Sequence, residues 1–236
     1  MQPTYYGILK STAAPSSLLT SITSYWTLNE SSGSAIDSTG LHNLTNSNIT
    51  YSQTGKLNTC YSFNGTSSYT GNLVGSASYT FAAAMSASFW MKTSGTGTFM
   101  FIVSNWNATN GTGWLVYKDT DDNVYFEVHN PGTGAATSTV AITGSSQADG
   151  NWHHIVGTFD GTYARIYLDS TLEMTSSAWP YSIAANSNTF SIGSDETTQY
   201  YYSGYLDEVG LWSRAITQTE VNKLYNSGAG KTYPFS

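Results

Sequence analysis

The sequence predicts an all-β protein, built as a two-sheet antiparallel β-sandwich with one short C-terminal helix. Charged residues make up only 10% of the 236-residue chain, whereas 18 tyrosines, 22 glycines and many Ser, Thr and Asn residues favour strands and tight turns. Short strand-like runs also recur along the chain with turn residues between them. At this length one domain can bury a large core, so we expect a single domain, residues 23–236, after an N-terminal arm, residues 1–22.

The strand-like runs give the order of the elements. The first, SYWTLNE at 24–30, opens the domain after an arm that lacks strand alternation. In the run SASFWMK at 86–92, Ala87, Phe89 and Met91 share one apolar face of a strand. The other expected strands are residues 60–65, 85–93, 99–106, 113–119, 123–130, 138–142, 151–159, 163–169, 189–194 and 204–212.

One helix is expected after the last strand. Thr217 can cap its N-terminus, and Glu220 completes a capping box three residues later. Ile216 and Val221 are spaced for a hydrophobic staple, and Gly228 suits the position just after the helix. We expect this helix to pack on the sandwich.

Charge and hydropathy exclude several classes of partner. The net charge is −7, and the eight Lys and Arg residues form no cluster, so nucleic acid is not expected. The sequence has neither a signal-peptide pattern nor eighteen consecutive apolar residues, so membrane insertion is not expected either. Location stays open, with a virion or an extracellular surface as candidates. The lone Cys60 is expected to be a buried thiol.

The stretch NWHHIVGTFDGTY, residues 151–163, raises the question of a reaction centre. Strand alternation sends His153 and His154 to opposite faces, so the two histidines cannot share a proton or a metal ion. Asp160 and Gly161 suit a reversing turn, and the stretch therefore predicts a hairpin. Three tryptophans are expected in the core: Trp114, Trp152 and Trp212.

This hairpin, continued as NWHHIVGTFDGTYARIYLD, resembles the hairpin of laminin-G-like, concanavalin A-like jelly-roll domains. The resemblance extends to YWTLNESSG (25–33), DSTG (37–40), GKLNTCYSFNG (55–65), SASFWMK (86–92) and GYLDEVGLWSRAITQTEV (204–221). It covers residues from about 25 to 226 and implies a jelly-roll sandwich. Three positions depart from the family pattern, namely Asn29, Asn64 and Ser170.

Catalysis is not expected. Glucan hydrolases among the relatives carry Glu-x-Asp-x-Glu on one strand, and this spacing is absent here. The nearest acids, Asp119, Asp121 and Asp122, belong to a turn-like loop. Asp207 and Glu208 adjoin on a strand and are expected to face opposite ways. We therefore predict no catalytic residues and no enzyme.

The resemblance also implies a structural calcium ion on the convex side of the sandwich. Matched residue by residue, Asp207 would be the carboxylate ligand and Gly65 a carbonyl donor, with Asp37 a looser candidate. The alternative is that Asp207 accepts backbone hydrogen bonds from an early loop.

The expected function is non-catalytic binding of carbohydrate or another extracellular ligand, as in a lectin or an adhesion domain. Sugars stack on exposed aromatic rings beside amides and carboxylates, and two loops offer this combination. A protein contact or packing between strands is the alternative for these side chains. The candidate residues are Trp106, Asn105, Asn107, Tyr200, Tyr201, Tyr202 and Trp179.

A second hypothesis is a structural or decoration subunit of a larger assembly, such as a phage virion. The arm carries apolar side chains that suit docking on another copy of the chain or on a scaffold. Alternatively, the arm wraps back on its own sandwich. These side chains are Pro3, Tyr5, Tyr6, Ile8, Leu9, Leu18 and Leu19.

Overall fold

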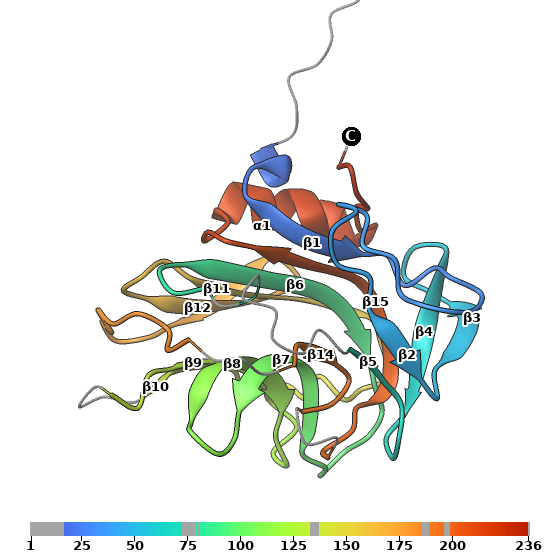
Figure 1. Ribbon diagram of the computed structural model, residues 1–236, viewed down its shortest axis with the longest axis horizontal. Coiled ribbons are helices and arrows are strands. Elements are labelled where there is room, and N and C mark those ends of the chain that lie inside the picture. The colour runs from blue at the N-terminus through green and yellow to red at the C-terminus, as the bar shows by residue number, and fades with distance from the viewer. Residues whose placement is uncertain are drawn as a thin grey trace, which may run out of the picture.

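The computed structural model describes residues 17–71, 79, 81–132, 137–185, 189–195 and 199–235. These residues form two antiparallel sheets that face each other, which confirms the predicted sandwich (Figure 1). The eight-stranded sheet runs β13 (Thr171–Thr175), β12 (Ala164–Leu168), β11 (His153–Phe159), β6 (Met85–Lys92), β15 (Ser203–Trp212), β4 (Thr59–Asn64) and β3 (Thr50–Thr54), and β1 (Ile22–Trp26) also pairs with β15. The seven-stranded sheet runs β10 (Thr137–Ile142), β9 (Val124–His129), β8 (Thr112–Lys118), β7 (Met100–Asn107), β14 (Ser191–Ile192), β5 (Tyr69–Gly71) and β2 (Thr45–Ser47).

The main core lies between the two sheets. Alternate residues of the central strands point into it, including Ala87, Phe89 and Met91 of β6, as the sequence predicts. The sheets approach closely at Gly157, where a Cβ atom would lie 2.7 Å from the ring of Phe126. The size of this core, with many side chains at 0% exposure, explains why the sandwich needs no disulfide.

A second layer covers the outer face of the eight-stranded sheet. The helix α1 (Gln218–Tyr225), the 3-10 turns η1 (Ser17–Leu19) and η3 (Asn226–Gly228) and the C-terminal tail lie on that side (Figure 1). The covering residues and the sheet residues beneath them form one buried cluster: Leu18, Tyr25, Val156, Tyr167, Trp212, Ile216, Val221, Leu224 and Phe235.

The helix begins as predicted. Thr217 accepts a hydrogen bond from the Glu220 backbone, and the Glu220 side chain bonds back to the Thr217 backbone, which completes the capping box. At the other end the first left-handed residue is Asn226, with φ of 49°, and the expected Gly228 follows two residues later with φ of 85°. An Asn at this position is tolerated because its short side chain hydrogen-bonds locally, here from Nδ2 to the Gly230 carbonyl.

The last residues of the predicted arm pack on their own sandwich. Leu18 is fully buried, and the Trp212 indole donates a 2.7 Å hydrogen bond to its carbonyl. The Arg214 guanidinium donates to the carbonyls of Ser17 and Thr20. Of the apolar arm residues, Pro3, Tyr5, Tyr6, Ile8 and Leu9 lie outside the described residues.

The histidine hairpin forms, and its two imidazoles lie apart. His153 stands between the carboxylates of Asp149 and Asp169, whereas His154 is buried against Ser88. The expected burial of Cys60, Trp114 and Trp212 is confirmed. The expected burial of Trp152 is wrong, because this residue precedes β11 and remains half-exposed.

Candidate ligand-binding face

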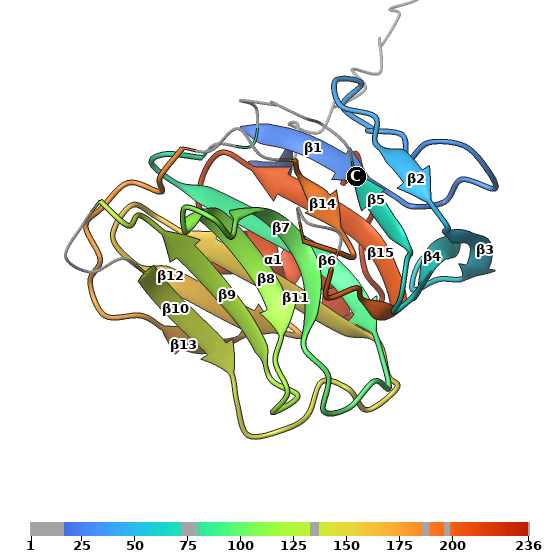
Figure 2. The ribbon, with the colours of Figure 1, turned by 60° about the horizontal axis from the view of Figure 1, so that its bottom comes forward.

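The outer face of the seven-stranded sheet is the candidate site. Strands β10, β9, β8 and β7 lie side by side there, and the described helix lies behind the sandwich in this view (Figure 2). Strand register aligns the outward side chains in rows, because residues opposite each other on antiparallel strands point to the same face. One row joins Phe101, Tyr117 and Tyr125, and the next joins Leu115, Glu127 and Thr139.

The first row is an aromatic platform. The rings of Tyr117 and Tyr125 stack with centroids 5.1 Å apart and an interplanar angle of 9°. Phe99 packs at 5.1 Å from both Tyr117 and Tyr200 and so extends the platform. Tyr200 is 53% exposed at its edge. Tyr125 and Tyr200 therefore offer ring surface to solvent.

Glu127 is the carboxylate at the centre of the face. It accepts hydrogen bonds from the Tyr117 hydroxyl (2.9 Å), the His129 Nε2 (2.8 Å) and the Thr139 hydroxyl (3.1 Å). Burial alone would raise the pKa of this carboxyl, but the hydrogen bonds from His129, Tyr117 and Thr139 outweigh burial and lower the pKa. Glu127 is thus an ionised acceptor held in a fixed orientation.

Trp106 lies at the far end of the same face. Its ring centroid is 4.2 Å from that of His129. Gly113 of β8 lies between these two residues and pairs with each of them, and it has no side chain to separate the two rings. Trp106, His129 and Glu127 therefore bring a ring, an imidazole and a carboxylate onto one surface.

The structure separates the candidate residues that the sequence grouped together. Trp106, Asn107, Tyr200 and Tyr201 are half-buried or exposed, as the hypothesis requires. The exposure expected for three others is wrong: Asn105, Tyr202 and Trp179 are 1%, 0% and 3% exposed.

Each of these three residues has a packing reason for its burial. Asn105 follows the outward Ser104 on β7 and faces the opposite way. Tyr202 stacks edge-on against Phe63, and Trp179 does so against Phe159, both inside the main core.

The residues of the face that were not predicted from the sequence include Tyr117, Tyr125, Glu127 and His129. Their signal was the alternation in GWLVYK and NVYFEVH, where Tyr, Glu and His alternate with core residues.

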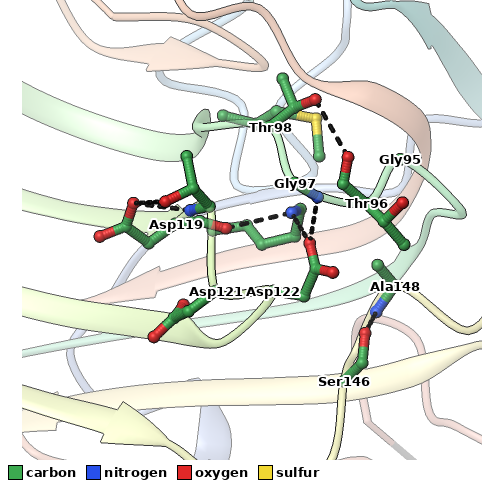
Figure 3. Close-up of polar contacts among 12 residues, drawn as sticks. Gly95, Thr96, Gly97, Thr98, Asp119, Asp121, Asp122, Ser146 and Ala148 are labelled. Carbon is green, nitrogen blue, oxygen red and sulfur yellow. Dashed lines mark hydrogen bonds and ion pairs between the residues drawn. The ribbon is translucent and has the colours of Figure 1, made fainter.

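Gly97, Asp119 and Asp122 lie where two loops meet (Figure 3), and a buried lysine holds these loops together. The Lys118 side chain is fully buried, and its Nζ contacts the Asp122 carboxylate at 2.5 Å and the Asp119 carbonyl at 3.1 Å. Asp122 also accepts from the Gly97 backbone at 2.8 Å. The acidic loop at residues 119–122, which the sequence predicts as a turn, therefore also holds two loops together through Asp122.

One group of residues resembles a hydrolase triad in composition only. Ser24 Oγ lies 3.0 Å from His42 Nδ1, and the Asp37 carboxylate lies 3.5 Å from that same nitrogen. In a catalytic triad the acid and the nucleophile contact different imidazole nitrogens, so that the base relays a proton between them. Ser24 is also fully buried. This arrangement orients a turn and activates no nucleophile.

The two acids on β15 do not face opposite ways as predicted. Leu206 and Val209 both point into the core, and the register slips between Asp207 and Gly210, so one extra residue bulges from the strand. Glu208 takes the left-handed conformation with φ of 52°. Asp207 and Glu208 therefore both lie on the outer side of the sheet.

Three carboxylate oxygens at this bulge are buried without a hydrogen bond: Oδ1 of Asp207 and both oxygens of Glu208. The hydroxyls of Tyr25 and Thr232 face Glu208, but Tyr25 donates to the Lys231 carbonyl. Burial raises the pKa of Asp207 to about 8 and that of Glu208 to about 7. Carboxyls buried in this way are either protonated, which the raised pKa values favour, or paired with a cation.

Further oxygens meet at the neighbouring loop. A Cβ on Gly55 would lie 2.7 Å from Asp207 Oδ2, 2.7 Å from the Thr59 carbonyl and 2.8 Å from the Leu57 carbonyl. Asp207 Oδ2 also accepts from the Leu57 backbone, as the alternative interpretation expected. No group of three His, Cys, Asp or Glu side chains that could hold a metal ion occurs among the described residues, so a calcium ion here would depend on carbonyl oxygens beside the carboxylates.

The other two residues of the predicted calcium site lie elsewhere. Gly65 follows Asn64, which pairs with Ser203, whereas Asp207 is four residues further along β15, about 13 Å away at the usual strand rise. Asp37 accepts four hydrogen bonds, from the Tyr25, Thr39 and His42 backbones and the Thr39 hydroxyl. Its oxygens are already satisfied within its own turn.

Two facing antiparallel sheets, one of them covered on its outer face by the described helix, define a jelly-roll β-sandwich. The chain belongs to the concanavalin A-like lectin/glucanases superfamily, whose laminin-G model matches residues 63–222. No curated protein matches the chain. No helix among the described residues is long and apolar enough to cross a membrane.

Similar solved structures are toxin binding domains. The binding domain of Paraclostridial Mosquitocidal Protein 1 has a TM-score of 0.68 at 14% identity, covering 88% of this chain and 52% of that one. The binding domain of botulinum neurotoxin DC appears in complex with SialylT (TM-score 0.67, 13% identity) and with rat synaptotagmin II (0.65, 14%), with the same coverage. These likenesses show the fold, and the chain spans about half the length of these structures.

Proposed function

We propose that this domain is a non-catalytic glycan-binding module whose ligand lies across the outer face of β7, β8 and β9. The observation that carries the proposal is the row of aromatic rings beside the ionised Glu127. The C–H faces of a sugar ring stack on aromatic rings, while its hydroxyls require oriented polar groups. A glycan ligand would place the domain's action at a cell surface, an extracellular surface or a virion.

Two features favour a sugar over a protein ligand. Between the half-buried ring of Trp106 and the exposed ring of Tyr200 lies the charged Glu127, whereas the centre of a protein interface is depleted of charge. The polar groups are also fixed in place by hydrogen bonds among Glu127, His129 and Thr139, which lowers the entropy cost of binding a small ligand.

A glycan array tests the proposal, followed by titration of the selected glycan against Trp106→Ala and Tyr200→Ala. Loss of one stacking ring is expected to weaken binding by about tenfold, since an aromatic contact contributes on the order of 1 kcal/mol beyond its buried area. Tyr163→Ala is the matched control, because Tyr163 is 38% exposed beside the β11–β12 hairpin. Equal affinity of the folded Trp106 and Tyr200 variants and the parent would exclude this face as the site.

We also propose that calcium binds at Asp207 and Glu208 with carbonyls of the Gly55–Thr59 loop. The ion would supply charge neutralisation for the buried carboxylates and would fix the loop on the sheet. Added calcium is expected to raise the melting temperature, and EDTA to lower it. The Asp207→Asn variant should lose this response, whereas Asp37→Asn should keep it. A parent protein whose melting temperature ignores both calcium and EDTA has no such site.

A further inference from the structure

A second row of side chains crosses the outer face of the eight-stranded sheet, away from the helix. Tyr205 pairs with Ser62 on one side and with Lys92 on the other. Phe63, Met91 and Leu206 point into the core, so their neighbours in this row point outward. An aromatic ring therefore stands between a hydroxyl and an ammonium group.

This row forms one wall of a pocket of about 240 Å³. Pockets for drug-sized ligands have volumes of about 300–1,000 Å³, so this one suits a single sugar ring. Thr93 stabilises its rim, because its hydroxyl donates to the Ser203 carbonyl at 2.6 Å and its carbonyl accepts from Gly150 at 2.8 Å. The lining residues are Ser62, Phe63, Lys92, Thr93, Ser94, Gly150, Ser203, Gly204 and Tyr205.

The Lys92 ammonium and three serine hydroxyls of the pocket are not engaged by other described side chains. Within the described part of the chain, Lys92 forms no ion pair, and its recorded contact is the Tyr205 ring at 5.9 Å. The hydroxyls of Ser62, Ser94 and Ser203 likewise make no hydrogen bond with another described residue. A half-exposed ammonium beside three free hydroxyls provides donors for an anion without a protein acceptor to satisfy them.

The ring of Trp152 lies beside Tyr205, next to the residues that line the pocket. The tryptophan that the sequence placed in the core lies half-exposed with its ring centroid 6.4 Å from that of Tyr205. Two tilted rings beside an ammonium group match a sugar that carries a negative charge. Its C–H face would contact the rings, while its charged group would reach Lys92.

We propose that the Lys92 pocket binds an acidic saccharide, through a carboxylate or sulfate group held by Lys92, Ser62 and Ser203 and a sugar ring held by Tyr205 and Trp152. Asp207 lies two residues from Tyr205 on the same face, and its raised pKa favours the neutral acid. Asp149, which precedes the lining residue Gly150, binds Asn151 and His153. The pocket lies on the opposite sheet from the aromatic platform and is independent of the function proposed above.

The test is a titration of the full chain, followed by backbone amide chemical shifts, with three probes. They are the methyl glycoside of N-acetylneuraminic acid, N-acetylglucosamine 6-sulfate and neutral N-acetylglucosamine. The acidic probes are expected to shift amides around Ser62, Lys92 and Tyr205, and the neutral sugar to bind about tenfold more weakly, as the loss of one charge-assisted hydrogen bond predicts. The preferred acidic probe identifies the charged group as carboxylate or sulfate.

Three variants complete the design. Lys92→Met should weaken acidic probes by about tenfold, whereas Lys92→Arg, which keeps the charge, should stay within about threefold. Lys223→Met, on the exposed side of α1, is the matched control and should bind as the parent does. Trp106→Ala should also leave this binding unchanged, which separates it from the aromatic platform. The proposal is overturned if the acidic probes do not bind, if the neutral sugar binds equally well, or if folded Lys92→Met keeps full affinity.

Discussion

Replacing Asp207 with Asn is expected to stabilise the metal-free protein at neutral pH. The carboxyl is fully buried, and burial raises its pKa from an ordinary 3.8 to about 8. Asn has the shape of the protonated acid, and its side-chain oxygen can still accept from the Leu57 backbone. The variant would therefore keep the native contact without the energetic cost of a buried charge.

The pH dependence gives the size of the effect. Between pH 5 and 7 the folded state retains the Asp207 proton and the unfolded state has lost it, so stability falls as pH rises. The slope for one carboxyl is about 1.4 kcal/mol per pH unit, or about 2.7 kcal/mol over this range. Glu208, whose pKa is raised to about 7 by burial, adds to the slope in the same direction.

The assay is urea denaturation in EDTA at pH 5, 6 and 7. The free energy of unfolding of Asp207→Asn should fall less steeply than that of the parent, and the difference should grow by up to about 2.7 kcal/mol over the range. Glu173→Gln, at an exposed position of β13, should keep the slope of the parent. The reasoning would be refuted if Asp207→Asn were less stable than the parent by the same free energy of unfolding at every pH. Such a result would show that the contacts of the carboxylate outweigh the cost of its burial.

Two further substitutions test the packing of the sandwich and the start of its helix. Gly157→Ala should cost about 1–3 kcal/mol, measured by urea denaturation, because the added Cβ would lie 2.7 Å from the Phe126 ring between two packed sheets; an unchanged midpoint would mean that the sheets separate easily. Thr217→Ala should cost about 1 kcal/mol in a thermal melt through loss of the capping box with Glu220, whereas Thr217→Ser should keep most of that stability, and equal losses in both variants would argue against the cap.

Sequence pattern was sufficient for the strands that alternate clearly. Strands β6, β11, β12 and β15 lie within or close to their predicted runs, because each combines apolar core residues with flanking turn residues. Strands β2, β3, β5 and β13 were not predicted. All five residues of β13 are exposed, so it has no buried face to mark it, and its place at the edge of the sheet depends on pairing with β12.

The candidate site was less predictable because it depends on register. The aromatic platform is assembled from Phe101, Tyr117 and Tyr125, which lie on three strands, and only the pairing of those strands aligns them. The bulge at Glu208 could not be predicted from the sequence either. Its extra residue places the Glu208 side chain on the face of the sheet opposite to the one that strand alternation predicts. Loop aromatics were identified from sequence, but their burial, as at Trp179, depends on which strand ends they close.

The described chain enters the sandwich at η1 and leaves it beyond η3, and both ends lie over the same sheet, on the side of α1 (Figure 1). The aromatic platform lies on the opposite sheet. Both attachment points therefore lie on the side away from the platform, and several copies attached to one support could turn their platforms outward together. Such an array would gain avidity from a repetitive glycan, because each bound copy raises the effective concentration of its neighbours' sites at the same surface.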